Sequence, residues 1–329
     1  MTADHYPRLV ADIGGTNARF AIETEPFQLE HLLVLPCQDY GTFAAAMADY
    51  LAQTAMVIPR HVGIAIANPV TADNIRMTNH HWHFSIRAMQ KQLGVDTFLL
   101  VNDFRAQALA ITRMSAANLA LLNGPAEYHP VPKDRTVAVI GPGTGLGVSG
   151  LVPDGRGRMI ALSGEGGHVS YSPYDQLERQ LLSFAKQIYG GHVSAERLLQ
   201  GDGLLLIYRF MAGRNKTPPR KNTPAEVTHG ALVEYDPLCI KVLSRYCAIL
   251  GGFCADVVLT IGGVGGVYLG GGIIPRFIDF LKQSDFRRRF EDKGRLADYL
   301  RNVPVYVITH PNPGLLGAAV ALDNKLAIK

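Results

Sequence analysis

The fold of this chain is decided by the stretch Leu9-Val10-Ala11-Asp12-Ile13-Gly14-Gly15-Thr16-Asn17-Ala18-Arg19-Phe20. An apolar run ends at Asp12, paired glycines and two polar residues follow, and a second apolar run continues to Ile22. This pattern predicts a strand, a tight turn and a second strand. Successive N–H groups in such a turn bind anions, and Thr16 and Asn17 add side-chain donors. An ordinary hairpin, with glycines for backbone geometry only, is the alternative.

A similar stretch opens the second half of the chain. Residues 136–140 predict a strand, Gly141-Pro142-Gly143-Thr144-Gly145-Leu146-Gly147 predicts a glycine turn, and residues 148–152 predict a strand again. The repeated order, with a threonine in both turns, indicates an internal duplication. Two anion-binding turns suit a ligand held between two lobes, and a polyphosphate is the candidate.

Length and composition are typical of a soluble globular protein with two domains. The chain has 329 residues, of which 47% are hydrophobic and 18% charged, with a net charge of +4. The densest basic segments are Arg287-Arg288-Arg289 and residues 214–221. Neither has interleaved aromatic residues, so nucleic-acid binding is not favoured. The arginine triplet lies in a helical pattern beside Glu291 and Asp292, which favours a solvated face.

The cysteines and the apolar segments indicate the cellular compartment in which the protein is expected and whether a membrane span is predicted. The four cysteines form no C-x-x-C pair, so a zinc site is not expected. The N-terminus has no signal-peptide pattern, so reduced thiols and a cytoplasmic location are expected. Residues 257–274 form an apolar run long enough to raise the question of a membrane span. Seven of them are glycine, so we predict a helix end, a turn, a strand and a turn instead.

Hydrophobic periodicity predicts the order β-β-β-α-β-α-β-α in the first half. Three strands are expected within residues 9–35, further strands at 61–67 and 97–101, and helices at 43–54, 85–93 and 104–112. In the second half, helices are expected at 175–189, 194–200, 236 to about 259, from 275, and 315 to about 324, with strands around 268–269 and at 303–309. Thr223-Pro224-Ala225-Glu226 has the pattern of a capping box.

Polar or glycine residues fall at the predicted strand ends, where open α/β sheets bind ligands. They are Asp12, Asp103, Gly143 and Gly271. Asp103 follows an apolar strand and opens a helix, so its carboxylate could accept a proton from a hydroxyl. A plain helix N-cap is the alternative for Asp103. Asp12 could hold a metal ion directly or through water.

Two further segments carry polar side chains among glycines. Gly164-Glu165-Gly166-Gly167-His168 favours a carboxylate and an imidazole that bind vicinal hydroxyls, and a solvated glutamate on a surface loop is the alternative. Glu196 could supply another carboxylate, or be a first-turn glutamate favoured by the helix dipole. The histidines around Trp82, at positions 80, 81 and 83, are expected to be packing and surface residues.

In this order, the motifs resemble the bacterial glucokinase family, within the sugar kinase/actin/Hsp70 superfamily, over nearly the whole chain. The carrying motifs are Asp12 to Arg19, Met77-Thr78-Asn79, Asn102-Asp103-Phe104, Gly143 to Gly147, Gly164 to His168, His192 to Glu196, Gly270 to Arg276, and Asn312-Pro313-Gly314-Leu315-Leu316-Gly317. Asn68-Pro69 departs from the family, where many members have Cys-Pro. The cysteine-rich zinc motif of the related repressor/sugar-kinase group is missing from the sequence, which favours the glucokinase branch.

The resemblance implies an α/β fold of two actin-like (ribonuclease H-like) domains with a cleft between them. Residues 1–113 and 314–329 would form the small domain and residues 114–313 the large one. Glucose would be held by Asn102, Asp103, Glu165, His168 and Glu196, with Asp103 as the base. ATP would be bound by Ala11, Asp12, Ile13, Gly14, Gly15, Thr16, Asn17, Gly143, Thr144 and Gly145, with the nucleoside near Gly271 and Gly272. Mg²⁺ would be supported by Asp12 through water, and a homodimer is usual in such kinases.

Three alternatives stay open from the sequence. The nearest is a kinase for another hexose or an amino sugar. An actin-like or chaperone-type ATPase would lack the set Glu165, His168 and Glu196. A sugar-sensing regulator would carry DNA-binding helices before the core, and we expect no room for them because the first strand starts at Leu9.

Overall fold

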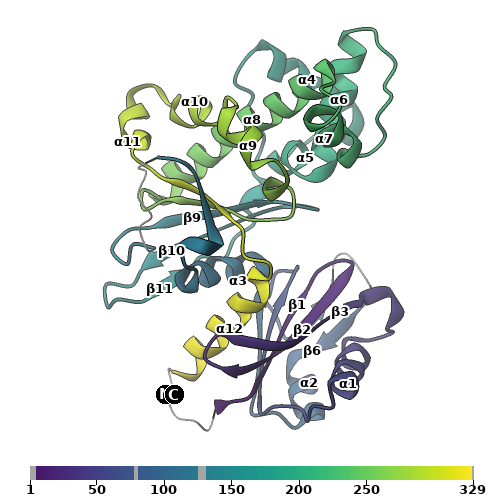
Figure 1. Cartoon of the computed structure of the whole chain (residues 1–329), viewed down its shortest axis with the longest axis vertical. Helices are drawn as coiled ribbons and strands as arrows, with labels where there is room; N and C mark the ends of the chain where they lie inside the picture. The colour runs from purple at the N-terminus through teal and green to yellow at the C-terminus, as the bar shows by residue number, and fades with distance from the viewer. Residues whose placement is uncertain (1–4, 78–80, 125–130, 328–329) are drawn as a thin grey trace. The chain divides into compact units, whose positions relative to one another are not determined.

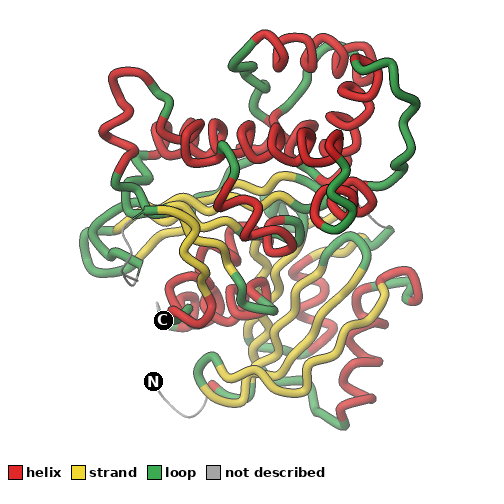
Figure 2. The backbone as a smooth tube through the Cα atoms, turned by 45° about the horizontal axis from the view of Figure 1, so that its top comes forward, coloured by secondary structure: helices red, strands yellow, loops and turns green. Residues whose placement is uncertain are grey.

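The computed structural model describes residues 5–77, 81–124 and 131–327 (Figures 1 and 2). The chain divides into two compact units, residues 1–114 with 310–329, and residues 115–309. Each unit is built around one main β-sheet with helices packed against it. Thr78, Asn79 and His80, which belong to sequence predictions above, lie outside the described residues.

The first unit contains a five-stranded sheet in the order β3-β2-β1-β4-β7. The strands are β1 (Arg8–Ile13), β2 (Asn17–Glu25), β3 (Gln28–Pro36), β4 (His61–Ile66) and β7 (Thr97–Asn102). β1, β4 and β7 run parallel, whereas β1–β2 and β2–β3 are antiparallel hairpins. All six residues of β4 are buried, as expected for a central parallel strand. The predicted three-strand start of the chain is confirmed.

Helices α1 (Phe43–Thr54), α2 (Ile86–Leu93), α3 (Asp103–Ala110) and α12 (Pro313–Leu326) complete the first unit. Thr42 and Ser85 cap α1 and α2 by accepting hydrogen bonds from Ala45 and Ala88. Phe20 stacks on Phe43 and Tyr50 in the core beneath α1. A short hairpin, β5 (Asn74–Arg76) and β6 (His83–Ser85), was not predicted because three-residue strands are too short to show a period.

The second unit contains a six-stranded sheet in the order β11-β10-β9-β12-β13-β8. Its strands are β8 (Leu119–Asn123), β9 (Val137–Pro142), β10 (Leu146–Pro153), β11 (Met159–Ala161), β12 (Val267–Leu269) and β13 (Val305–Ile308). β9, β12 and β13 are parallel, and β9–β10 and β10–β11 are antiparallel hairpins. Five of these strands thus repeat the order and directions of the first sheet, which confirms the predicted duplication. β8 is an additional antiparallel edge strand.

Among the described residues, the second unit has more helices than the first and contains the longest one, α8 (Pro237–Ile261). Its helices are α4 (Gln176–Tyr189), α5 (Ala195–Leu199), α6 (Gly201–Arg214), α7 (Pro224–Leu232), α8, α9 (Ile278–Gln283), α10 (Phe286–Glu291) and α11 (Ala297–Arg301). α6 was missed because Leu204 to Tyr208 are all buried, which leaves no polar stripe and hence no helical period.

Helix α8 explains the long apolar sequence near residue 257. In the part of the chain that the structure describes, it is the one helix long and apolar enough to cross a membrane, yet 72% of its most apolar window is buried inside the structure. α8 ends at Ile261 and β12 follows at Val267, which confirms the predicted helix end, turn, strand and turn. The apolar run at residues 257–274 is therefore the end of a core helix followed by a turn, a buried strand and a second turn.

Four local predictions need correction. The glycine turn is confined to residues 143–145, because β9 continues through Pro142 and β10 begins at Leu146. Ser194, predicted to cap the helix at 194–200, is the N-cap residue of α5, but its side chain makes no capping hydrogen bond. Thr223 caps α7, but Glu226 accepts from Asn222 N–H instead of closing a capping box. The solvated face predicted for residues 287–289 is wrong for Arg289, which is 5% exposed and ion-paired.

The C-terminal helix α12 belongs to the first unit and packs against α3 and β4 (Figure 1). A Cβ atom placed on Gly317 of α12 would lie 1.9 Å from the carbonyl oxygen of Ala106 in α3. The two helix backbones therefore meet at a point that tolerates no side chain. α3 follows β7 and α12 follows β13, so these are the equivalent helices of the two repeats.

We predict that Gly317→Ala destabilises the protein by about 1–3 kcal/mol, since the new methyl group must separate two packed helix backbones. The matched control is Gly213→Ala in α6, where a Cβ meets nothing within 4 Å. That change is expected to leave stability unchanged or to raise it by up to about 1 kcal/mol, the helix propensity difference. Urea denaturation of both variants tests this, and equal unfolding midpoints would contradict it.

Candidate active site

The first glycine turn joins β1 to β2 and is tied to two neighbouring segments. Gly14 N–H donates to the Asn17 carbonyl over 3.0 Å, and Cys37 N–H donates to the Thr16 carbonyl over 2.8 Å. Ala67 N–H, just after β4, donates to the Ile13 carbonyl over 3.0 Å. The side chain of Thr16 is exposed at the tip. These hydrogen bonds therefore fix the turn as a solvent-facing loop at the carboxyl end of β1.

Asp12 lies one residue before the end of β1 and is mostly buried. Its side chain is 20% exposed, and its Oδ2 lies 3.8 Å from Nη1 of Arg19, its register partner on β2. Gly314, in the first turn of α12, leaves room for it, because a Cβ there would lie 2.4 Å from Asp12 Cγ. Burial raises the pKa of Asp12 above its ordinary value, and the nearby Arg19 opposes this shift.

The donor set around Asp12 limits the kind of metal ion that fits. Within residues 5–77, 81–124 and 131–327, no three His, Cys, Asp or Glu side chains are grouped to hold a metal. A cage built from protein ligands alone is therefore not present there. Mg²⁺ keeps several waters and binds through one or two carboxylates together with substrate phosphates, and the single carboxylate of Asp12 fits that mode.

Asn102 and Asp103 lie where β7 passes into α3. Asn102 Oδ1 accepts from the N–H groups of Phe104 and Arg105 over 3.0 and 3.1 Å, so Asn102 is the N-cap. Asp103 is the first helical residue, and its Oδ1 accepts from Asn102 Nδ2 over 3.0 Å and from Phe104 N–H over 2.9 Å. The plain N-cap interpretation of Asp103 is therefore wrong. Its half-buried carboxylate lies at the same sheet edge as Asp12, since β7, β4 and β1 are parallel.

The second glycine turn, in the second unit, binds a carboxylate of its own. Gly143 N–H donates to the Gly145 carbonyl over 2.8 Å, and Gly201 N–H donates to the Gly143 carbonyl over 2.9 Å. Leu146 N–H donates to Glu196 Oε2 over 2.9 Å. A Cβ on Gly145 would lie 2.7 Å from the same oxygen. The carboxylate of Glu196 therefore occupies the space that a side chain at position 145 would take, and a larger residue there would have to displace it.

Glu196 is also close to His168. His168 Nε2 lies 3.9 Å from Glu196 Oε1, and the two side chains are 59% and 19% exposed. His168 lies in a 3₁₀ turn, Gly166–His168, which packs on β10 so closely that a Cβ on Gly167 would lie 2.0 Å from the Leu146 carbonyl oxygen. Exposed Glu165 precedes this turn, and its carbonyl accepts from His168 N–H over 3.0 Å. The second unit thus brings His168, Glu196 and the second glycine turn together.

A cavity of about 490 Å³ adjoins the second glycine turn. Its lining includes Gly143, Thr144, Gly201, Asp202, Thr223, Pro224, Thr228, Gly272, Ile273 and Arg276. Gly271 has a φ of +78°, and a Cβ there would lie 2.2 Å from the Pro142 carbonyl oxygen. This conformation and this contact both require glycine, and they bring the loop after β12 against the end of β9.

Gly143, Thr144 and Gly272 in the lining of this cavity were predicted from the sequence to bind ATP, whereas its other lining residues were not singled out. Asp202 lies in the first turn of α6, Thr223 is the N-cap of α7 and Thr228 lies within it, and Arg276 lies in a 3₁₀ turn, Ile274–Phe277. The Thr223 cap was visible as a helix signal, yet nothing in its local pattern pointed to a ligand. Only the packing of α6 and α7 beside the turn brings these residues to the cavity.

This chain is similar to known proteins over nearly its whole length. A family model described as Glucokinase matches residues 9–325. The glucokinase of Neisseria meningitidis serogroup C (strain FAM18) is 52% identical over 98% of this chain and 96% of that protein. The structure of a glucokinase from an Antarctic psychrotroph aligns with a TM-score of 0.85 at 33% identity, over 97% of this chain and 99% of that one.

A more distant structure shares the fold. The ROK-family glucokinase of Streptomyces griseus, in complex with glucose and AMPPNP, aligns with a TM-score of 0.66 at 18% identity, covering 97% of this chain and 100% of that one. The duplicated sheets therefore define an actin-like ATPase fold of the kind found in sugar kinases. The chain belongs to the glucokinase family. It is an enzyme, a kinase that phosphorylates glucose.

The raised pKa of Asp12 predicts how the thermal stability of the protein depends on pH. At neutral pH the folded state carries the cost of a buried charge that is fully solvated in the unfolded chain. Asp12→Asn should therefore raise the thermal midpoint of the ligand-free protein at pH 7. As the pH falls through the raised pKa, folded Asp12 takes up a proton and the difference between variant and wild type should shrink. Thermal unfolding from pH 7 to pH 4 measures this difference, and a variant less stable than wild type at pH 7 would contradict the prediction.

Proposed function

We propose that this enzyme transfers the γ-phosphoryl group of ATP to the 6-hydroxyl of glucose and forms glucose 6-phosphate and ADP. Support comes from the position and the hydrogen bonds of the Asp103 carboxylate. Because Asn102 performs the capping of α3, the Asp103 carboxylate is not needed to begin the helix. It is held at the carboxyl end of β7, where a base for a substrate hydroxyl is expected.

Asp103 acts as the general base. The 6-hydroxyl oxygen forms a bond to the γ-phosphorus while its proton passes to the Asp103 carboxylate, and the bond from phosphorus to the ADP oxygen breaks. Such a transfer demands little covalent chemistry from the protein, so positioning and charge stabilisation supply most of the rate. The hydrogen bond from Asn102 Nδ2 to Asp103 Oδ1 helps to keep the carboxylate in one orientation.

Glu165, His168 and Glu196 bind the other hydroxyls of the sugar, together with Asn102. The support is the arrangement in the second unit, where the imidazole of His168 and the carboxylate of Glu196 lie 3.9 Å apart. A pair of this kind can accept from and donate to neighbouring hydroxyls. A sugar that lacks a matching hydroxyl would leave such a group unpaired, at a cost of about 1–3 kcal/mol for each.

The two glycine turns bind the phosphates of ATP through N–H groups other than those of Gly14 and Gly143, which donate to carbonyls within the turns. In the first unit the phosphate site is formed by residues 11–17, with the exposed Thr16 at the tip of the turn that follows β1. In the second unit it is formed by Gly143, Thr144 and Gly145, and the adjoining cavity of about 490 Å³ takes the nucleoside beside Gly271 and Gly272. The AMPPNP complex of the Streptomyces griseus relative supports a nucleoside triphosphate as the donor.

Asp12 is the residue that would hold Mg²⁺, through water. When bound, the ion neutralises charge on the β- and γ-phosphate oxygens. The contribution of the chain is a carboxylate that α12 and Arg19 fix in place. The described cysteines are free and buried, which suits a reducing compartment, and a cytoplasmic location stays a prediction from the sequence. A homodimer stays a prediction from the family resemblance.

We predict that Asp103→Asn lowers kcat by about 10²-fold or more and leaves glucose affinity nearly unchanged, the pattern of a lost general base. Steady-state kinetics and calorimetric glucose binding measure the two effects. The matched control is Asp96→Asn, which removes an exposed carboxylate paired with Arg60 and should leave both values at wild type. Wild-type turnover in Asp103→Asn would exclude Asp103 as the base.

The substrate assignment is tested by ADP release from ATP with glucose, mannose, fructose and glucosamine, and with no sugar. We expect the highest kcat/KM with glucose, and ³¹P NMR of the product should show a phosphate on the 6-hydroxyl. Fastest turnover with a different sugar would replace glucose by that sugar. Release that does not depend on any sugar would favour an actin-like ATPase.

A further inference from the structure

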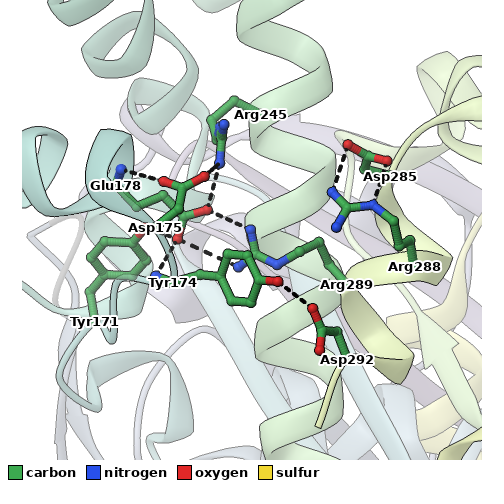
Figure 3. Close-up of polar contacts among 9 residues, drawn as sticks. All are labelled: Tyr171, Tyr174, Asp175, Glu178, Arg245, Asp285, Arg288, Arg289 and Asp292. Atoms are coloured by element: carbon green, nitrogen blue, oxygen red, sulfur yellow. Dashed lines mark hydrogen bonds and ion pairs between the residues drawn. The ribbon is translucent and has the colours of Figure 1, made fainter. Parts of the chain in front are cut away.

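A buried carboxylate lies behind the segment that carries His168. Glu178, in the first turn of α4, is 0% exposed and accepts hydrogen bonds from four groups (Figure 3). The donors are the Tyr171 hydroxyl at 2.7 Å, Tyr174 N–H at 2.9 Å, Arg289 Nη1 at 2.6 Å and Arg245 Nη1 at 3.0 Å. They come from α8, α10 and the loop before α4, so Glu178 is the point at which these elements meet.

The cluster formed by Glu178, Asp175, Arg245 and Arg289 contains equal numbers of positive and negative side chains. Arg245 Nη1 also donates to Asp175 Oδ2 over 2.7 Å, and the guanidinium of Arg289 lies 3.8 Å over the ring of Tyr174. Two arginines thus face two carboxylates. Burial favours the neutral form of Glu178, but the hydrogen bond from Arg289 and the other donors outweigh it and hold the pKa of Glu178 below its ordinary value. Glu178 is therefore ionised at neutral pH.

Tyr171 connects this cluster to the candidate sugar-binding residues. Its N–H donates to the Val193 carbonyl over 2.9 Å, and Ala195 N–H donates to the Val169 carbonyl over 2.9 Å. These two bonds form an isolated antiparallel bridge centred on Ser170 and Ser194. His168 immediately precedes one side of the bridge and Glu196 immediately follows the other. The bridge therefore sets the spacing between His168 and Glu196.

We propose that Glu178 is a positioning residue for sugar binding, which acts through Tyr171 to hold the bridge and so keeps His168 and Glu196 in register. The inference rests on the proposed sugar-binding role of His168 and Glu196. Ionised Glu178 orients the Tyr171 hydroxyl, and Tyr171 is itself 8% exposed, so its ring has little freedom. A ligand-binding pair held in advance loses less conformational entropy when the sugar binds.

The chemistry of the cluster favours this role over a purely stabilising one. Buried ion pairs can be replaced by apolar residues of similar volume with little loss of stability, so stability alone does not require them. Charged hydrogen bonds are directional, and here four of them converge on one carboxylate. Their direction determines where Tyr171, and hence the bridge, can lie.

The test is Tyr171→Phe, which removes the hydroxyl and keeps the ring. We expect the KM and the Kd for glucose to rise roughly tenfold, the scale of one hydrogen bond to a charged group, with the KM for ATP within about twofold of wild type. The matched control is Tyr50→Phe in the first unit, a buried tyrosine whose hydroxyl donates to the His31 carbonyl over 3.0 Å. It should lower the unfolding midpoint and leave the glucose KM unchanged.

A double-mutant cycle separates this inference from the proposed function. If Tyr171 acts through His168, then Tyr171→Phe should change the glucose KM much less in a His168→Ala background than in the wild type. A His168→Ala enzyme with a wild-type glucose KM would overturn the sugar-binding role itself. If His168→Ala raises the glucose KM while Tyr171→Phe only lowers stability, or if the two effects multiply fully, the positioning role of Glu178 is overturned. Glu178→Gln, if it folds, should resemble Tyr171→Phe; a wild-type glucose KM in that variant would also overturn the proposal.

Discussion

Parallel pairing of strands is the constraint on which this structure depends. In each unit three parallel strands end at one sheet edge, and the hairpin beside them turns at that same edge. Main-chain hydrogen bonding therefore gathers Asp12, Asp103 and the first glycine turn in one unit, and the second glycine turn and Gly271 in the other. Strand pairing thus brings the proposed catalytic residues to the strand ends from positions far apart in the sequence.

Two glycines in this protein, Gly145 and Gly314, leave room for carboxylates. The carboxylate of Glu196 occupies the space that a side chain at position 145 would take, and the carboxylate of Asp12 occupies the corresponding space at position 314. A carboxylate thus lies against a glycine near each turn proposed to bind phosphate, and a larger residue in place of that glycine would have to displace it. In the second unit this links the turn proposed to bind phosphate with a residue proposed to bind sugar, through the bond from Leu146 N–H to Glu196.

Most elements could be predicted because they carry a clear period, cap or glycine boundary. The helix at residues 43–54 and the strands of the first sheet are examples. The failures at α6 and Arg289 share one cause, which is that burial depends on neighbours distant in sequence. α6 lacks a polar stripe because it is covered on several sides, and Arg289 was assigned to solvent because its partner, Glu178, lies 111 residues away.

The sequence by itself determined the duplicated α/β pattern, the two glycine turns and the resemblance to the glucokinase family. These depend on local periodicity and short motifs, which the order of residues encodes directly. Only the tertiary structure decided that Asn102 and not Asp103 caps α3, that Glu196 lies against Gly145, and that Glu178 anchors the segment after His168. Each of these is a choice of hydrogen-bond partner, and a side chain has many possible partners until the chain is packed.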